Sequence, residues 1–297
     1  MKKEIKNIAA SVRSRLINVA DESKRDYNAL LRLYFQERFL YRLSISPYKT
    51  KLILKGALLL MMNDISKFRP TKDIDFLGKA VSNEMNGCKE IIKEIASIDA
   101  ADGVEFICDN ISTEKIKEGE DYEGVRIHLP YKMETVKGYL SIDIGFGDKI
   151  TSGPVEIEFP ILLDFPSPHI FVYSMESAVA EKFEAIVKLN FTTSRMKDFF
   201  DLLFIAERTE FKKSTLKEAL LITFSNRETD IEERHLIYED AFKNNTQKQT
   251  QWTSFLTRNK LTTEENFAKV VDKINSFIEP VFHDDKQKWN PKKFLWE

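Results

Sequence analysis

The segment Asp73-Ile-Asp-Phe-Leu77 alternates charged and apolar side chains, and it constrains the fold more than any other part of the chain. On a β-strand, residues two positions apart point to the same face, so Asp73 and Asp75 project together while their apolar neighbours face the opposite side. Two carboxylates this close repel each other unless a cation lies between them. Mg²⁺ is such a cation, and it uses one or two carboxylates together with substrate phosphates. The pattern therefore predicts a strand with one buried face and one metal-binding face.

A third acid has a similar setting. In Ser141-Ile-Asp-Ile-Gly145, Asp143 alternates with two isoleucines, which predicts a strand with a single acid on its polar face. In a two-metal site, one ion activates the attacking oxygen and the other stabilises the leaving group. Each aspartate alone would also suit an exposed strand, but the combination with Asp73 and Asp75 favours a metal site.

A glycine lies where a short strand is expected to turn into an apolar helix, in Leu54-Lys-Gly-Ala-Leu58. Free backbone N–H groups at a helix N-terminus bind phosphate, and a residue without a side chain lets phosphate approach. Arg69 adds a positive charge between this turn and the aspartate strand. Glycine is also common at such turns for steric reasons, so the position of Gly56 before the aspartates is what favours phosphate binding.

Two predicted helices bring further charged residues. Lys182 lies in the first, and the second contains Lys-Asp-Phe-Phe-Asp at 197–201. Asp198 and Asp201 are three positions apart and share a helical face, with Lys197 beside Asp201. One interpretation is a surface ion pair. The other is that Lys182 and Lys197 neutralise a triphosphate while the aspartates hold them in place.

Strands with interleaved helices come first and helices come last, which predicts an α+β fold with a catalytic domain over residues 1–172 and a helical domain over 173–297. The predicted helices cover about Ile5–Ala20, Asp21 or Asp26 to Leu43, Leu58–Met62, Ser82–Ala96, Met175–Leu189, Arg195–Glu207, Ser214–Phe224 and Thr263–Ile278. The predicted strands are Lys51–Leu54, Asp73–Leu77, Val104–Cys108, Gly124–Leu129, Tyr139–Phe146 and Val155–Leu163.

Composition excludes several classes of protein. The net charge is −2, yet residues 1–51 hold twelve Lys and Arg against five Asp and Glu, which suits either an anionic partner or a solvated helical face. Cys88 and Cys108 have no paired spacing, so we expect neither a disulfide framework nor a cysteine zinc site. There is no P-loop, Rossmann or H-E-x-x-H motif. No apolar run has the length of a membrane span, so we expect a cytoplasmic protein.

Together these motifs resemble the polymerase-β-like nucleotidyltransferase superfamily, in which a glycine turn, D-x-D and a third acid follow in that order. More narrowly, the chain resembles the AbiEii-type toxin nucleotidyltransferases, the MenT group among them, of type IV toxin–antitoxin and abortive-infection systems. The matching segments are Ser11-Val-Arg-Ser-Arg-Leu16, Glu37-Arg-Phe-Leu-Tyr-Arg42, Leu54-Lys-Gly-Ala57, Arg69-x-Thr-x-Asp-x-Asp75, Ala180-Glu-Lys182 and Arg195-x-Lys-Asp-x-x-Asp-Leu202.

The resemblance implies a polymerase-β-like core and metal-dependent transfer of a nucleoside monophosphate from an NTP, with Mg²⁺ or Mn²⁺ as cofactor. It implies that Asp73, Asp75 and Asp143 bind metal. It also implies a nucleotide site made of Lys55, Gly56, Ala57, Arg69, Thr71, Lys182, Lys197, Asp198 and Asp201. The superfamily usually has Gly or Ser where this chain has Ala57, so a hydroxyl contact to phosphate is lost there.

The same resemblance implies a growth-blocking toxin of phage defence, an RNA acceptor with tRNA as the expected RNA, and a cognate antitoxin encoded nearby. Two other functions stay open. One is the same chemistry on a protein or a small molecule. The other is a nucleotide-binding protein without catalysis. After Phe211 no further motif is matched.

Overall fold

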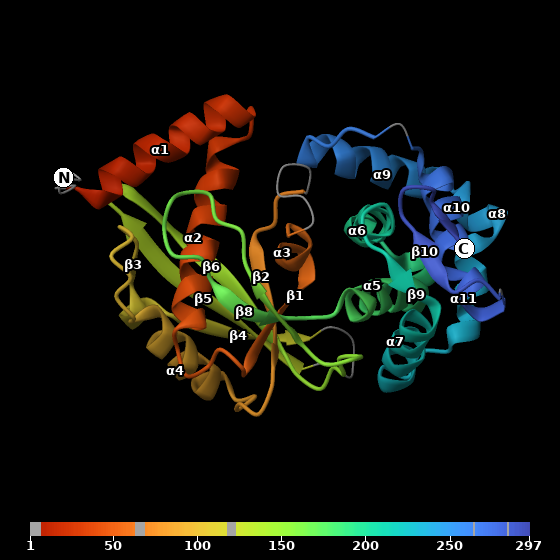
Figure 1. Cartoon of the computed structure of the whole chain (residues 1–297), viewed down its shortest axis with the longest axis horizontal. Helices are drawn as coiled ribbons and strands as arrows, with labels where there is room; N and C mark the ends of the chain where they lie inside the picture. Colours follow the sequence, from red (N-terminus) through yellow and green to blue (C-terminus); the bar gives the residue numbers. More distant parts are fainter. Residues whose placement is uncertain (1–6, 63–68, 118–122, 264, 284) are drawn as a thin grey trace. The chain divides into compact units, whose positions relative to one another are not determined.

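The computed structural model describes residues 7–62, 69–117, 123–263, 265–283 and 285–297. The chain divides into two compact units, of which unit 1 comprises residues 1–147 and 154–172 and unit 2 comprises residues 148–153 and 173–297 (Figure 1). The short segment 148–153 lies within the first predicted domain, but its contacts place it in unit 2. Its Asp148 lies 3.1 Å from Arg227, and the backbone N–H of Thr151 donates to Ser177 over 3.0 Å.

Unit 1 is built on a mixed sheet in the order β3-β5-β6-β2-β1-β8-β7, with β4 also paired to β5. Its strands are β1 Leu52–Lys55, β2 Asp73–Gly78, β3 Glu105–Phe106, β4 Ser112–Lys117, β5 Glu123–Met133, β6 Val136–Gly145, β7 Val155–Glu158 and β8 His169–Val172. Strand β2 runs parallel to β6 and antiparallel to β1, and β1 runs parallel to β8. A mixed sheet with helices confirms the predicted α+β fold class.

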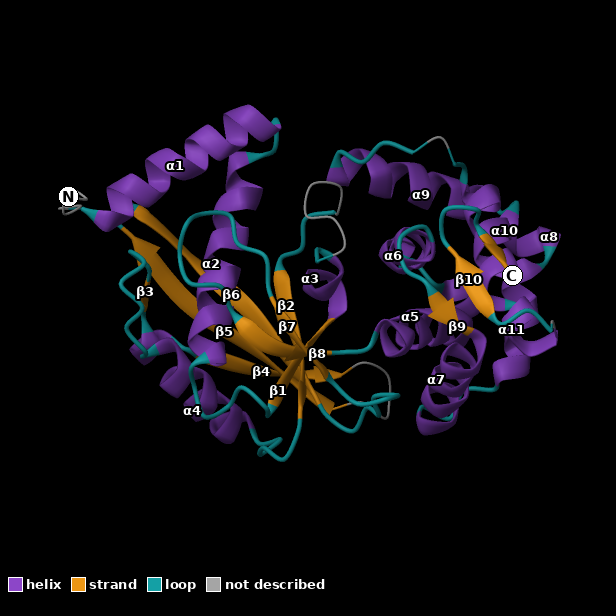
Figure 2. Cartoon of the chain, viewed as in Figure 1, coloured by secondary structure: helices purple, strands orange, loops and turns teal. Residues whose placement is uncertain are grey.

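The helices of unit 1 are α1 Ile8–Ser23, α2 Tyr27–Ser44, α3 Gly56–Leu60 and α4 Met85–Ala96, with a short 3₁₀ helix at Cys108–Asn110. Helix α2 lies across one face of the sheet (Figure 2). Its Phe35 stacks on Tyr131 with ring centroids 3.7 Å apart, and its Phe39 lies 6.4 Å from Phe76. We call this the covered face, and the side bearing the alternate residues of β2, β5 and β6 the open face.

Unit 2 is mainly helical, as predicted for the last part of the chain. Its elements are α5 Met175–Leu189, α6 Met196–Ala206, α7 Lys213–Asn226, α8 Asp240–Lys243, α9 Thr246–Asn259, α10 Phe267–Ile278, α11 Pro280–His283, 3₁₀ helices at Asn190–Thr192 and Ile231–Tyr238, and strands β9 Phe211–Lys212, β10 Lys288–Asn290 and β11 Leu295–Trp296. The indole N–H groups of Trp289 and Trp296 donate to the carbonyls of Ala206 and Phe277 over 2.7 and 2.9 Å. These bonds fasten the small sheet to the helices. Within the described residues, no helix is both long and apolar enough to cross a bilayer.

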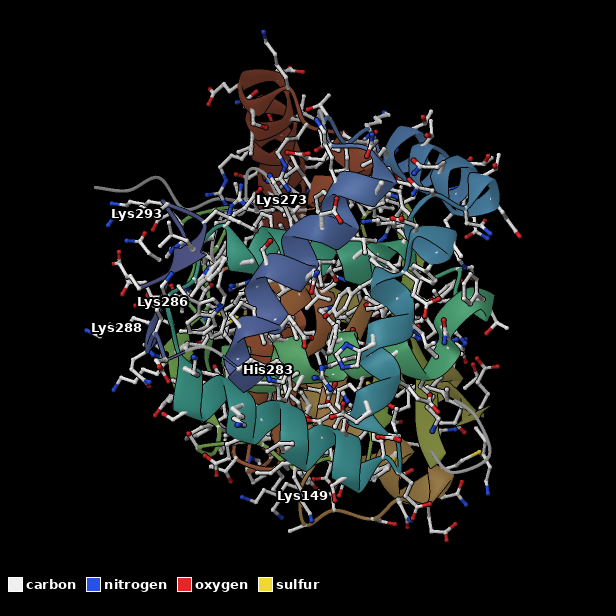
Figure 3. All side chains as sticks on the ribbon, turned by 90° about the vertical axis from the view of Figure 1, so that its right-hand side faces the viewer. Lys149, Lys273, His283, Lys286, Lys288 and Lys293 are labelled. Carbon is white, nitrogen blue, oxygen red and sulfur yellow. The ribbon has the colours of Figure 1, made fainter. Side chains whose placement is uncertain are left out.

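Exposed lysines gather on the side of unit 2 that carries its small sheet. Lys286, Lys288 and Lys293 lie there with their side chains directed outward (Figure 3). The ammonium of Lys293 lies 2.7 Å from the carboxylate of Glu297, four positions later. An exposed pair of this kind contributes little to stability.

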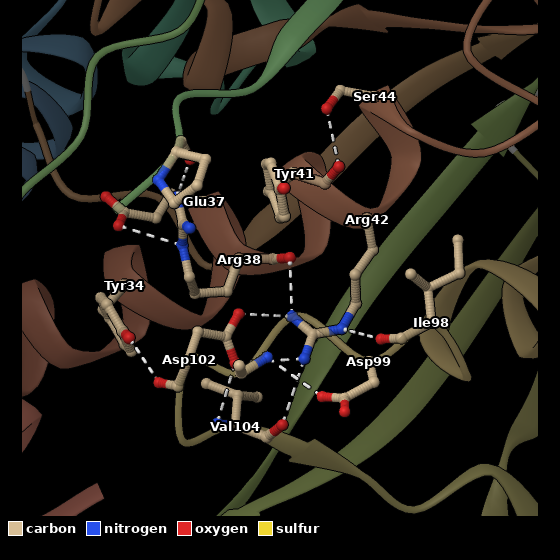
Figure 4. Close-up of polar contacts among 12 residues, drawn as sticks. Tyr34, Glu37, Arg38, Tyr41, Arg42, Ser44, Ile98, Asp99, Asp102 and Val104 are labelled. Atoms are coloured by element: carbon tan, nitrogen blue, oxygen red, sulfur yellow. Dashed lines mark hydrogen bonds and ion pairs between the residues drawn. The ribbon is translucent and has the colours of Figure 1, made fainter. Parts of the chain in front are cut away.

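Charged side chains of α2 lie inside unit 1. Arg42 donates hydrogen bonds of 2.7 and 3.1 Å to the two carboxylate oxygens of Asp102 (Figure 4). Arg38 is fully buried and donates to the carbonyl of Pro166 over 3.0 Å. Two cations of the basic stretch 1–51 therefore hold unit 1 together. They are not part of a surface that could meet an anionic partner.

The predicted boundaries differ from the observed ones mainly at turns. Helix α2 begins after Asp26 rather than Asp21, because the Asp26 carboxylate caps its first turn. Ser82 does not cap α4, since its hydroxyl accepts from the backbone of Glu84 over 3.1 Å in a turn before the helix. Strand β3 keeps only part of its predicted length. The elements that were not predicted are β4, β8, β9, β10, β11, α8, α9 and α11. The predicted first helix starts at Ile5, outside the described residues.

Candidate active site

The acids of the predicted metal site lie on two neighbouring parallel strands. Asp75 of β2 is in register with Asp143 of β6, and Asp73 is in register with Ser141. Both aspartates of β2 are half-buried, whereas Phe76 and the residue between the aspartates are fully buried. The three carboxylates therefore lie on the open face, opposite α2.

Gly56 begins α3 directly after β1, and its backbone has a φ of +70°, which residues with a side chain rarely adopt. Its predecessor Lys55 is in register with Asp75. A Cβ atom at position 56 would lie 2.1 Å from Oδ2 of Asp75, which is far inside contact distance. The turn therefore requires glycine for its backbone and for its contact with the acid. The helix starts at Gly56, two positions before the predicted Leu58.

Three other predicted nucleotide-binding residues of unit 1 pack or form hydrogen bonds within the unit. Ala57 is buried, so its methyl group packs inside the unit. Arg69, which precedes β2, is only 8% exposed. The Thr71 hydroxyl donates to the carbonyl of Asp73 over 3.3 Å, and the Gln36 amide of α2 donates to the carbonyl of Thr71 over 3.5 Å. These bonds fix the segment that leads into the aspartate strand.

Arg126 of β5 was not among the predicted site residues, yet it pairs directly with the third acid. It is in register with Asp143, and its Nε and Nη2 donate to the two carboxylate oxygens over 2.8 and 2.6 Å. The hydrogen bond to Asp143 raises the pKa of Arg126, burial opposes this shift, and the negative charges of Asp143, Asp73 and Glu114 add to it. Two parallel charge-assisted bonds make this a strong, directional pair.

Lys182, Asp198 and Asp201 form one cluster in unit 2. The Lys182 ammonium lies 2.6 Å from Asp201 and 3.4 Å from Asp198, and Arg195 lies 2.5 Å from Asp198. The two aspartates are 0% and 2% exposed, so the interpretation as a surface ion pair is wrong. Of the two lysines predicted to be held by these aspartates, Lys182 of α5 contacts Asp201, whereas Lys197 is exposed.

The charges of this cluster outweigh the effect of burial. Burial opposes ionisation of Asp198, but Lys182, Arg195 and Lys197 hold its pKa below the ordinary value. Asp198 is therefore a carboxylate at neutral pH. The Lys182 side chain is 11% exposed and that of Arg195 is 31% exposed, so the cations of the cluster reach solvent while its aspartates are buried.

The donor set on the open face of unit 1 suits a hard divalent cation. Asp73 and Asp75 offer carboxylate oxygens, and Mg²⁺ takes its remaining ligands from water and substrate phosphates. Among the residues that the structure describes, no group of three or more His, Cys, Asp and Glu side chains forms a metal cluster by itself. The carboxylates of Asp73 and Asp75, which share one face of β2, fit such an ion.

A family model described as "Nucleotidyl transferase AbiEii toxin, Type IV TA system" matches residues 38–273 of the chain. The chain belongs to the AbiEii family. The resemblance that its motifs indicated is thereby confirmed, and the matched range contains every residue of the predicted site. AbiEii membership makes the chain a nucleotidyltransferase toxin of type IV toxin–antitoxin systems, which implies an antitoxin partner.

Two solved Helicobacter pylori structures were also matched. The JHP933 protein has 14% identity and a TM-score of 0.49, with 86% of this chain and 92% of that one covered. A protein provisionally described as a nucleotidyltransferase has 14% identity and a TM-score of 0.43, with 87% and 99% covered. No curated protein sequence matches the chain.

Proposed function

We propose that this AbiEii-family protein transfers a nucleoside monophosphate from an NTP to an RNA, with tRNA as the expected acceptor, in a reaction that needs Mg²⁺ or Mn²⁺. The observation that carries the metal and nucleotide part is the arrangement around Asp75. This acid is in register with Asp143 on one side, and Gly56 contacts it on the other. Carboxylates can bind a metal ion, and a helix N-terminus that begins with glycine lets phosphates approach that ion.

In the proposed reaction, the acceptor hydroxyl oxygen bonds to the α-phosphorus of the NTP as the bond from that phosphorus to the pyrophosphate oxygen breaks. The hydroxyl proton leaves to solvent, and pyrophosphate departs. A bound divalent ion would lower the negative charge of the triphosphate. Asp73 and Asp75 would hold that ion, and Gly56 would leave room for the phosphates. Arg126 fixes the Asp143 carboxylate in position beside them through two hydrogen bonds.

The RNA part of the proposal has less support from the basic stretch 1–51 than its composition indicates, because Arg38 and Arg42 are buried. Incubation of the purified protein with each radiolabelled NTP, Mg²⁺ and total cellular RNA and protein tests it. We expect label in RNA with at least one NTP, and none when EDTA replaces Mg²⁺ or when Asp75 is changed to Asn. Label in protein or in a small molecule would show that the acceptor is a protein or a small molecule and not RNA.

The growth of bacteria that express the protein tests whether it acts as a toxin in the cell. Expression of the wild-type chain should arrest growth, Asp75→Ala should not, and co-expression of the antitoxin encoded nearby should restore growth. If the wild type and Asp75→Ala were equally toxic, growth arrest would not depend on the proposed transfer reaction. An abundance check by immunoblot excludes a variant that is simply degraded.

A further inference from the structure

The open face of unit 1 continues beyond the acids along β5 and β6. Arg126 lies opposite Asp143, and His128 lies opposite Ser141. Tyr139 follows on β6, two positions before Ser141. Because side chains alternate along both strands, these polar and aromatic residues share the face that carries the carboxylates.

Tyr139 is the most exposed of the large hydrophobic side chains in the described part of the chain, at 62%. Its ring meets the ring of His128 edge to face, with centroids 5.1 Å apart and an interplanar angle of 89°. Its neighbour Leu140 points to the covered face and is fully buried. An exposed aromatic ring held in one orientation on a sheet offers a flat surface on which another ring can stack.

The strand order separates this surface from the predicted phosphate turn. Gly56 follows β1, on one side of β2, whereas β6 and β5 lie on the other side. If the triphosphate lies at Gly56, the acceptor reaches the carboxylates from the side of β6. Tyr139 precedes Asp143 by four residues on the same strand, a distance of about 13 Å. A chain that reaches the carboxylates along β6 passes over Tyr139.

Cations accompany the aromatic pair. Lys132 and Lys137 are paired across β5 and β6, on the face that carries Arg126. Lys137 is exposed. Lys132 lies 2.7 Å from Glu105, but both side chains are exposed, and exposed pairs of this kind are readily exchanged for another anion. Aromatic rings interleaved with lysines are the pattern by which proteins bind single-stranded nucleic acid.

We propose that this surface, made of Arg126, His128, Lys132, Lys137 and Tyr139, binds the single-stranded end of the RNA acceptor. A base upstream of the terminal nucleotide stacks on Tyr139, and the backbone phosphates lie near the lysines. RNA ends expose unstacked bases that aromatic side chains recognise in this way. This inference rests on the proposed function and names the part of unit 1 that holds its acceptor.

The test compares Tyr139→Ala with Tyr139→Phe, which keeps the ring, and Lys137→Ala with Lys115→Ala. Lys115 is an exposed lysine in register with Val125, which is buried on the covered face, so it serves as a matched control. The measurements are the KM for RNA, the KM for NTP, and binding of a fluorescent single-stranded RNA by anisotropy at several salt concentrations.

We expect Tyr139→Ala to raise the KM and the Kd for RNA about tenfold, since one stacked base accounts for a change of that order. The KM for NTP should stay unchanged, and Tyr139→Phe should resemble the wild type. Lys137→Ala should weaken binding and lower the salt dependence by about one phosphate contact, and Lys115→Ala should do neither.

The outcomes separate this inference from the proposed function. If the wild type labels RNA and Tyr139→Ala keeps the wild-type KM for RNA, the surface is wrong and the proposed function stands. A parallel rise in the KM for NTP would assign the ring to the nucleotide and overturn the inference. If the wild type labels protein alone, both the proposed function and the inference fail. Melting temperatures on the same preparations identify a variant that fails to fold.

Discussion

Arg126 and Asp143 face each other across β5 and β6 and share two hydrogen bonds, of 2.8 and 2.6 Å. The third acid of the candidate site is thus neutralised by a cation of the protein itself. Two parallel charge-assisted hydrogen bonds fix the relative orientation of a guanidinium and a carboxylate. Asp143 therefore holds Arg126 in a fixed position beside the acids of β2.

Replacement of Arg126 by Met should lower the transfer rate about 100-fold, the order found when one fixed donor is removed from an active site. Arg126→Lys should recover only part of this loss, because an ammonium keeps the charge but cannot form the two-pronged contact. The measurements are kcat, the affinity for Mn²⁺ without NTP, and the melting temperature. Arg126→Met should bind Mn²⁺ more tightly, because Asp143 loses the cation that it pairs with. If the transfer rate and the Mn²⁺ affinity were both unchanged, Arg126 would not be part of the active site.

Gly56→Ala should reduce transfer at least tenfold, because the added methyl group pushes against the Asp75 carboxylate. Gly153→Ala is a matched control. Gly153 has a φ of +75°, close to the +70° of Gly56, but a Cβ atom there meets nothing within 4 Å. Both variants should lose about 1–2 kcal/mol of stability from backbone strain, and only Gly56→Ala should lose activity. Similar activity in the two variants would contradict the contact with Asp75.

Lys182→Met should destabilise the protein by about 3–5 kcal/mol, since it leaves the buried carboxylates of Asp198 and Asp201 without their shared cation. Lys197→Ala, at an exposed position, should change the free energy of unfolding by less than about 0.5 kcal/mol. Urea unfolding at neutral pH measures both. A Lys182→Met protein as stable as the wild type, but without transfer, would assign Lys182 to the nucleotide alone.

Glu37 should make the stability of the fold depend on pH. Burial raises its pKa to about 8, while the Arg38 charge and a 2.9 Å hydrogen bond from the Leu162 N–H oppose the shift. In the unfolded chain its pKa is about 4.3, so between these values the native state binds one proton more. The free energy of unfolding therefore falls as pH rises through this window, by at most about 1.4 kcal/mol per pH unit.

Glu37→Gln isolates that contribution. The amide stays neutral and can still accept from Leu162, so the variant should lack the decline that the wild type shows between about pH 5 and pH 8. Melting temperatures of both proteins across this range provide the comparison. Parallel curves would show that Glu37 is ionised in the native state.

The part of the candidate site that could be predicted follows from the alternation of charged and apolar side chains along single strands. The shared face of Asp73 and Asp75 follows from the geometry of a single strand. Arg126 escaped prediction because its partner lies seventeen residues away on another strand, and only the register of β5 with β6 brings the two together. Lys182 and Asp201 likewise meet only because α5 packs on α6.

The fold was predictable where the apolar pattern is strong and less so where it is short. Strand β4, with the sequence Ser-Thr-Glu-Lys-Ile-Lys, is a polar edge strand without an apolar run. Strand β7 ends at Glu158, whereas the prediction continued to Leu163. Pro160 lacks the N–H that a further ladder bond needs. The count of charged residues in 1–51 could not predict that Arg38 and Arg42 are buried, because composition does not show which cations have hydrogen-bond partners in the protein interior.

The contact between Asp148 and Arg227 also sets an order of events while the chain is being made. The two residues are 79 positions apart, so at about 5–20 residues per second Asp148 leaves the ribosome roughly 4–16 s before its partner. In that interval β7 and β8, which follow segment 148–153, can already join the sheet of unit 1. Segment 148–153 can contact Tyr173 and Ser177 early in this interval, and the hydrogen bond from Arg227 completes its attachment to unit 2 only after α7 has been translated.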